Sequence, residues 1–261
     1  MRVRPAAVAG MFYPHDAGEL TATVSGLLQQ ASADLKSDTA SPKALIVPHA
    51  GYIYSGLTAA FAYATISSAH IKRVVLFGPA HRVPFTGLSL PDCDIFSTPL
   101  GSVRLDQAGM QTALTLPQVS LNAYAHAQEH SLEVQLPFLQ LLLDDFELVP
   151  LCVGVTEPGQ VADVMRLLWG DEETLLLISS DLSHYHNYAQ ARAIDGQSID
   201  ALLAKKHDLS HDQACGATAI NALQLIADEK QLRPLLLDYR NSGDTAGDKD
   251  RVVGYASIGY Y

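Results

Sequence analysis

The sequence predicts an α/β fold in which a mostly parallel central sheet is covered by helices on both faces. Short apolar runs rich in valine, isoleucine and leucine recur without polar alternation, as is typical of strands buried on both faces. Segments of helical periodicity lie between these runs. The 261 residues show no shift in composition and no internal repeat, so we expect a single domain spanning residues 1–261.

The N-terminal half is expected to alternate between helix and strand. Apolar residues recur at helical spacing after turn-forming residues such as the Pro-His-Asp-Ala segment at 14–17. The polar stretch at 37–43 is expected to be a loop. The predicted elements are, in order, a helix at 18–31, a strand at 44–47, a helix at 57–66, a strand at 73–77 and a helix at 129–143.

The C-terminal half continues the same pattern. The helix that begins at Pro158 has its proline in the first turn, where the missing N–H is tolerated. The acidic stretch NSGDTAGDKD at 241–250 lacks the calcium-loop pattern and is expected to be a turn between two strands. The predicted elements are a strand at 146–153, a helix at 158–169, a strand at 174–178, helices at 188–205 and 213–229, and strands at 234–239 and 252–258.

Composition excludes several classes of function. The formal net charge is −11, with 17 Lys and Arg against 28 Asp and Glu and no basic cluster. We therefore expect no nucleic-acid partner and no adsorption to anionic membranes. No apolar stretch is long enough to span a bilayer, and the N-terminus lacks the apolar core of a signal peptide, so a cytoplasmic location is expected.

Histidine and aspartate residues follow three predicted strands at their carboxyl ends. His49 follows the first predicted strand and His81 the second. Asp181 and His184 lie in the segment SSDLSHYH, directly after the strand at 174–178. Because ligands bind at the carboxyl ends of strands in open α/β sheets, we expect these side chains to converge on one site. Taken singly, each histidine could equally be a hydrogen-bonded surface residue.

Cys215 is the cysteine most suited to chemistry. It lies in HDQACGATAINAL, where a predicted helix begins, and the helix dipole is expected to favour its thiolate, the form that binds metals. Packing at the helix start is the alternative. Cys152 is expected to be a core residue and Cys93 a loop residue. Three cysteines without CxxC spacing argue against a disulfide framework and a zinc knuckle.

The segment AQEHSLEVQLPFL carries a further cluster of polar residues. Glu129 and Glu133 are four apart and are expected to share a helix face, with His130 beside the first. An acidic first helical turn is an equally good explanation, and whether Glu129 or His130 reaches the strand-end site stays open. The motifs HExxH, GxGxxG, GxxxxGK[ST] and GxSxG are absent.

Five separated motifs occur together in one order: PHAGYIYSG, GPAHRVPF, EHSLEVQLPFL, SSDLSHYH and ACG. The flanking segments AGMFYP and NSGD…VVGYAS accompany them. This set resembles the Memo family, the B component of the AmmeMemoRadiSam system, from about residue 10 to residue 257. The resemblance implies an α/β fold similar to that of the class III extradiol dioxygenases, which are non-haem iron enzymes. It also implies a radical-SAM enzyme and the system's A component as partners.

The family resemblance also implies a metal pocket. Two histidines and a cysteine form it in Memo proteins and hold iron or copper. The matching motifs place these ligands at His49, His81 and Cys215. Extradiol dioxygenases use two histidines and a carboxylate instead, so the softer thiolate places ring cleavage in doubt and leaves metal binding plausible.

Three function classes follow from this pocket. The first is an iron- or copper-dependent, dioxygenase-like oxidoreductase acting on a small molecule, with His184 as general acid or base and Asp181 orienting it or a metal ligand. The second is a zinc-dependent hydrolase with Glu129 or His184 as base. The third is a metal- or peptide-binding protein whose active site is vestigial. Glu129 could also supply an oxygen ligand to the metal.

Overall fold

The computed structural model describes residues 1–35, 41–67 and 70–261, and most of the predicted loop at 37–43 lies outside them. Four parallel strands form the centre of the sheet, with β3 between β8 and β9, and β9 between β3 and β2. They are β2 (Ala44–Val47), β3 (Arg73–Pro79), β8 (Glu147–Val153) and β9 (Thr174–Ser179). Their apolar side chains are almost completely buried, which matches their unbroken hydrophobic sequences.

Within the described residues the sheet has 12 strands, and its order along the main path is β1-β5-β6-β8-β3-β9-β2-β12-β10. Antiparallel strands flank the parallel centre, because β12 pairs with β2, β10 and β11. The remaining strands are β1 (Val3–Arg4), β4 (Leu88–Leu90), β5 (Ile95–Thr98), β6 (Gly101–Leu105), β7 (Val119–Leu121), β10 (His184–His186), β11 (Pro234–Asn241) and β12 (Val252–Tyr260).

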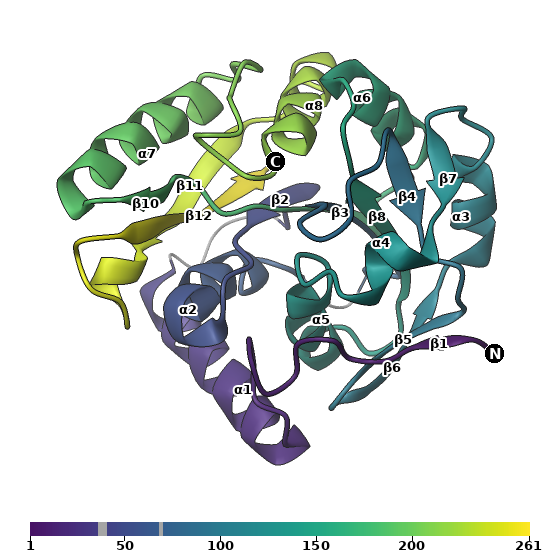
Figure 1. Cartoon of the computed structure of the whole chain (residues 1–261), viewed down its shortest axis with the longest axis horizontal. Coiled ribbons are helices and arrows are strands. Elements are labelled where there is room, and N and C mark those ends of the chain that lie inside the picture. The colour runs from purple at the N-terminus through teal and green to yellow at the C-terminus, as the bar shows by residue number, and fades with distance from the viewer. Residues whose placement is uncertain (36–40, 68–69) are drawn as a thin grey trace.

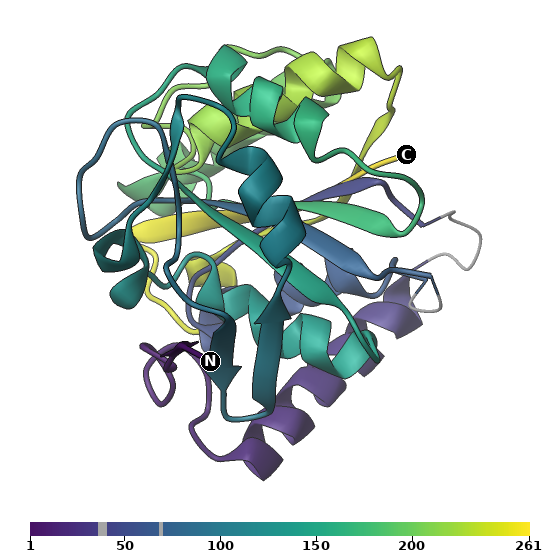
Figure 2. The same ribbon diagram turned by 90° about the vertical axis from the view of Figure 1, so that its right-hand side faces the viewer.

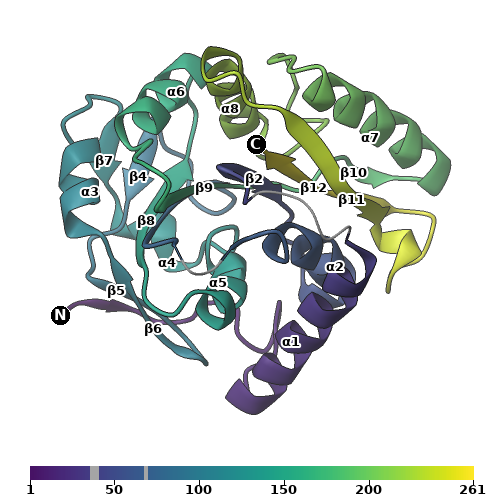
Figure 3. The same ribbon diagram turned by 180° about the vertical axis from the view of Figure 1, so that it is seen from behind.

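Helices cover both faces of this sheet (Figures 1 and 2). On one face α1 (Ala17–Asp34), α2 (Tyr52–Tyr63) and α5 (Leu136–Leu142) pack together. On the other face lie α6 (Pro158–Leu167), α7 (Tyr188–Leu203) and α8 (Ala217–Glu229), and Figure 3 shows α6 and α8 side by side, away from α1 and α2. The short helices α3 (Gln107–Ala113) and α4 (Ala123–Ala127) lie near β8 and β4.

The predicted α/β class, the mostly parallel sheet and the predicted strands are confirmed, with three corrections. Strand β11 is only partly buried, because it lies at the edge of the sheet and pairs with β12 alone. The short strands β1, β4, β5, β6, β7 and β10 were not predicted. The predicted helix at 129–143 is wrong in its first half: residues 129–132 are irregular, a 3₁₀ turn η1 spans Glu133–Gln135, and α5 follows.

Pro137 explains where α5 begins. It occupies the first turn of the helix, the position that tolerates a proline, and a helix started at residue 129 would have placed it in the interior. Glu129 and Glu133 therefore do not share a helix face. No helix in the described part of the chain is long and apolar enough to cross a membrane.

Candidate metal centre

The carboxyl ends of β2, β3 and β9 meet at one place, as the sequence predicted. Val47 pairs with Ser179, and Phe77 pairs with Ile178, so the three strands end almost level. The segments that follow bring His49 and His81 together, with their ring centroids 5.1 Å apart. Both line a cavity of about 640 Å³, a size that suits a small-molecule ligand.

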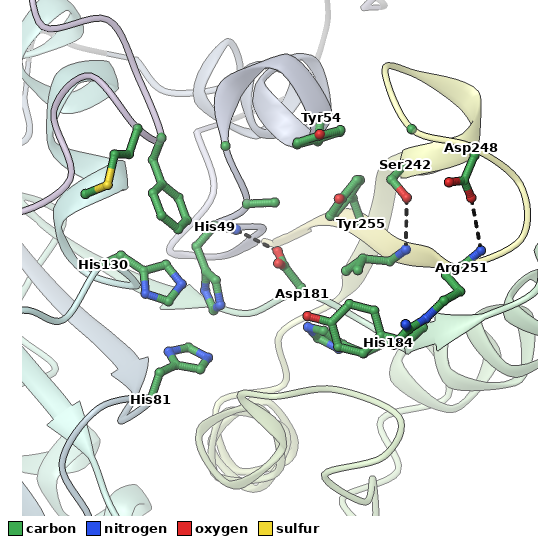
Figure 4. Close-up of a pocket in the computed structure, with 17 residues that line it drawn as sticks. His49, Tyr54, His81, His130, Asp181, His184, Ser242, Asp248, Arg251 and Tyr255 are labelled. Carbon is green, nitrogen blue, oxygen red and sulfur yellow. Dashed lines mark hydrogen bonds between the residues drawn. The ribbon is translucent and has the colours of Figure 1, made fainter.

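A third histidine completes this cluster. One ligand nitrogen from each of His49, His81 and His130 lies within 4.8 Å of the others. The ring of His130 is 4.6 Å from that of His81 and 5.4 Å from that of His49, centroid to centroid. Figure 4 shows the three rings gathered at one end of the cavity. Three imidazoles are a ligand set that can hold one ion of zinc, copper or iron.

Hydrogen bonds fix which nitrogen of His49 is available. Its Nδ1 lies 2.9 Å from the hydroxyl of Ser179, which itself donates to the carbonyl of Ser131 at 2.6 Å. Since the single hydroxyl proton is used there, the Nδ1–H of His49 must be the donor to Ser179. The lone pair is therefore on Nε2. Burial and the neighbouring histidines lower the pKa of His49 well below its usual value, which keeps the ring neutral and able to bind a metal.

Glu129 fixes His81 in the same way. Its carboxylate accepts the backbone N–H of His81 at 2.6 Å and Nδ1–H at 2.9 Å, so Nε2 is the ring nitrogen that remains to bind a metal. Glu129 is 1% exposed. Burial alone would raise its pKa, but the hydrogen bonds and charge of His81 and the N–H of Ser131 lower it to about 2. A carboxylate behind a histidine is a common support for metal ligands, so Glu129 orients His81.

The segment that carries Glu129 and His130 lies close against β3. A Cβ added at Gly78 would be 2.7 Å from the hydroxyl oxygen of Ser131, so the close approach requires glycine. The buried Nδ1 of His130 has no hydrogen-bond partner among the described residues. Burial lowers the pKa of His130 to about 4. Its Nδ1 lies 3.3 Å from Oε1 of Glu129 without forming a hydrogen bond, and a neutral imidazole in this setting fits a role as metal ligand.

Asp181 lies behind His49 and supports its backbone. The carboxylate is 4% exposed and accepts the N–H of His49 at 2.7 Å, a contact drawn in Figure 4. Burial raises its pKa to about 7, although the N–H groups of His49 and Ala50 and the charge of His81 act in the opposite direction. The sequence placed Asp181 near the site, and the structure shows that it contacts the backbone of His49.

Cys215 lies next to His49 but outside the cluster of three histidines. Its Sγ is 3.3 Å from His49 Nε2. The thiol also lines a second cavity of about 380 Å³, together with Pro79, Phe85 and His211. Burial and the charge of Asp181 raise the pKa of Cys215 to about 12, so the expected dipole-driven thiolate is wrong for the protein alone. A bound cation would be needed to hold the thiolate.

His184 lies at the other end of the cavity. It begins β10 and pairs with Val253 of β12. Burial lowers its pKa, so the ring is neutral at neutral pH and can accept a proton. In Figure 4, His184 and Arg251 lie opposite His81 and His130, with His49 and Asp181 between them. The three strand-end groups that the sequence selected are thus in one cavity.

A buried ion pair between Arg4 and Glu133 holds the segment that carries His130. The guanidinium of Arg4 contacts Glu133 at 2.6 Å and donates to the carbonyls of His126 and Glu129, each at 2.7 Å. Glu133 is fully buried and also accepts the hydroxyl of Tyr13 at 2.6 Å. This network fixes the irregular segment that carries Glu129 and His130 to the N-terminal residues.

His130 is the site residue that the sequence did not select, and Glu129 has a different setting from the one expected. Both were expected on a helix, and the sequence leaves open whether either residue reaches the strand-end site. The proline at 137 was the available signal, because it indicates that the helix begins after residue 135 and that residues 129–132 are free to turn toward β3.

Known proteins match this chain over nearly its whole length. A family model described as "Memo-like protein" matches residues 4–259. A MEMO1 family protein of Aquifex aeolicus is 38% identical over 272 residues, covering 99% of each chain. One of Methanosarcina mazei is 35% identical over 276 residues, again covering 99% of each. One of Thermoplasma volcanium is 32% identical over 266 residues, covering 98% of this chain and 97% of the relative.

Proposed function

The chain belongs to the Memo-like protein family, and from that premise we propose that it is a metal-dependent oxidoreductase acting on a small molecule in the 640 Å³ cavity. His49 and His81 would hold one iron or copper ion through Nε2. Either Cys215, next to His49, or His130, which completes the imidazole cluster, would supply the third ligand. When bound, such an ion supplies one-electron chemistry and binds oxygen donors.

One observation carries this proposal: His49 and His81 are each hydrogen-bonded to the protein through Nδ1, which makes Nε2 the nitrogen of each ring that can bind a metal. Ser179 holds one ring and Glu129 the other, each through Nδ1–H. Residues with a purely structural role would have no need for two imidazoles at such close distance. Imidazole rings that are held through one nitrogen while the other faces a neighbouring ligand group are typical of metal sites.

The protein's own residues can also move protons beside the substrate. His184 is neutral and lies on the opposite wall, where it can take a proton from a bound hydroxyl and return it. Asp181 keeps the backbone of His49 in place, and Glu129 keeps the ring of His81 in place. The buried setting of these carboxylates excludes water from the back of the site.

A zinc-dependent hydrolase is the second candidate, and the cluster of three histidines favours it. Three histidines and one open position are the ligand set of catalytic zinc in carbonic anhydrase. Zinc lowers the pKa of its bound water, and His184 could then accept the proton. Metal identity separates this candidate from the first.

The test is metal content after anaerobic purification of wild type and of His49→Ala, His81→Ala, Cys215→Ala and His130→Ala. We expect near-stoichiometric iron or copper in wild type and its loss in His49→Ala and His81→Ala. Whichever of the other two variants also loses metal identifies the third ligand. His126→Gln is the matched control, because this buried histidine lies outside the cluster and should keep the metal.

Circular dichroism of each variant shows whether the fold survives the substitution. Zinc in all preparations would favour the hydrolase. A wild-type protein that binds no metal even after reconstitution with iron, copper and zinc would rule out both enzymes and leave a binding protein with a vestigial site.

A further inference from the structure

Arg251 is the single lysine or arginine among the described residues that line the cavity. It lies at the end opposite the histidine cluster, beside His184 (Figure 4). The protein carries a formal net charge of −11, so the positive charge of an arginine at this cavity is opposite in sign to the net charge of the chain. Its side chain is exposed.

The guanidinium of Arg251 has no acidic partner. Within the described residues it forms no ion pair and no hydrogen bond, and its contact is with the ring of Tyr185, 5.0 Å from its centroid. Most other arginines of the chain, such as Arg4 and Arg166, are paired with carboxylates. An arginine stacked on an aromatic ring keeps its hydrogen-bond donors available to a ligand.

Tyr185 is held in an unfavourable backbone conformation. Its φ is +63°, in the left-handed region that costs a non-glycine residue free energy. The ring is 64% exposed, so burial of the side chain does not explain this conformation. Such strain is concentrated at functional sites, and here it places the ring against Arg251 at the wall of the cavity.

The acidic residues that line the cavity do not contact the guanidinium of Arg251. Asp248 uses its Oδ1 to accept the backbone N–H groups of Asp250 and Arg251 at 2.9 and 3.2 Å, as drawn in part in Figure 4. Asp181 accepts the backbone N–H of His49. Each carboxylate is therefore engaged with main-chain donors.

We propose that the ligand of this cavity is a small aromatic carboxylate, whose carboxylate binds Arg251 while its ring faces the histidine cluster. This inference rests on the proposed function, since it places the substrate in the same cavity as the metal. One guanidinium matches the single charge and the planar shape of a carboxylate. A phosphate carries more charge than this one arginine compensates. The rings of Phe12, Tyr54 and Tyr185 provide aromatic walls.

The experiment is isothermal titration of the full-length protein with benzoate and with benzyl alcohol, a neutral molecule of the same size. Each titration is made on the protein as purified and again after chelation, because a carboxylate can also bind a metal. We expect benzoate to bind wild type more tightly than benzyl alcohol does. Arg251→Gln should weaken benzoate about ten- to hundredfold in both metal states and leave benzyl alcohol unchanged.

Lys249→Gln is the matched control. It removes the same charge from the same loop, but Lys249 contacts Tyr188 and does not line the cavity. The inference is overturned if Arg251→Gln binds benzoate as wild type does, if Lys249→Gln has an equal effect, or if wild type shows no benzoate binding at millimolar concentration.

The two proposals fail separately. If the protein binds metal but Arg251→Gln does not weaken benzoate binding, the oxidoreductase proposal stands and the aromatic-carboxylate proposal fails. If the protein binds benzoate through Arg251 but never binds metal, the aromatic-carboxylate proposal stands and the oxidoreductase proposal fails. Metal content is measured on the same samples.

Discussion

The two ends of the cavity differ in how firmly they are built. At the histidine end, each ring or its backbone is held by a buried group, and Glu129 alone accepts three N–H groups. At the Arg251 end, Tyr185 is 64% exposed and contacts Arg251 through ring and guanidinium alone. Residues that bind a metal must be held in a fixed geometry. Exposed residues such as Tyr185 and Arg251, which have few contacts, can be substituted without damage to the core.

The largest effect should come from breaking the ion pair beneath the histidine end. Arg4→Met leaves the carboxylate of Glu133 buried without its partner, and we expect the free energy of unfolding to fall by about 3–5 kcal/mol. Urea denaturation measures this. The control is Arg2→Met, whose exposed ion pair with Asp92 should matter by less than about 1 kcal/mol. Equal losses in the two variants would contradict the support that we assign to Arg4.

The support of the histidine end should also be sensitive to acid. Burial lowers the pKa of His126 to about 4, while the unfolded chain titrates at the usual 6.5. Between these values the unfolded state binds more protons, so stability is complete above pH 6.5 and falls as the pH drops to 4, by about 3 kcal/mol.

Urea denaturation of wild type and His126→Gln at several pH values measures this contribution. Glutamine cannot take up the proton, so the difference in unfolding free energy between the two proteins should change with pH across this window. A difference that stays constant from pH 4 to pH 7 would show that His126 does not titrate as expected.

Removing the charge of Glu129 should weaken metal binding without unfolding the protein. Glu129→Gln keeps the shape of the side chain but holds the His81 ring less firmly, and we expect metal affinity to fall about ten- to hundredfold. Competition with a chelator gives the affinity. Glu172→Gln, at an exposed position, should leave it unchanged. Full affinity in Glu129→Gln would mean that Glu129 does not orient His81.

The smallest change in the free energy of unfolding is expected at the Arg251 end of the cavity. Tyr185→Gly removes a left-handed penalty of about 1–2 kcal/mol and adds about 0.5–1 kcal/mol of unfolded-state entropy, so the free energy of unfolding should rise by up to about 1.5 kcal/mol. Tyr124→Gly, at an exposed helical position, should instead lower it by about 0.5 kcal/mol. Metal content should not change in either variant. A clear loss of stability in Tyr185→Gly would show that this end is as firmly built as the other.

The difference between the ends also explains what could be predicted from the sequence. His49, His81 and Asp181 directly follow hydrophobic strands, and the rule that parallel strands end at one edge was enough to bring them together. The central strands were predictable for the same reason, since burial on both faces leaves an unbroken apolar pattern.

The features of the site that could not be predicted from the sequence depend on contacts between segments far apart in the chain. Arg4 reaches Glu133 across most of the N-terminal half of the chain, and no local pattern indicates that pairing. His130 joins the cluster because Gly78 lets an irregular segment lie against β3. Arg251 stacks on Tyr185, whose backbone has a positive φ, and neither the contact nor the backbone strain leaves a mark in hydrophobic periodicity.

The position of β2 has a consequence for synthesis of the protein. Its neighbours in the sheet are β9 and the last residues of β12, where Ile46 pairs with Ile258. The strand that presents His49 can therefore find both partners only when the ribosome has made residues 258–260. Until then the strand that leads to His49 lacks one of its two neighbours in the sheet.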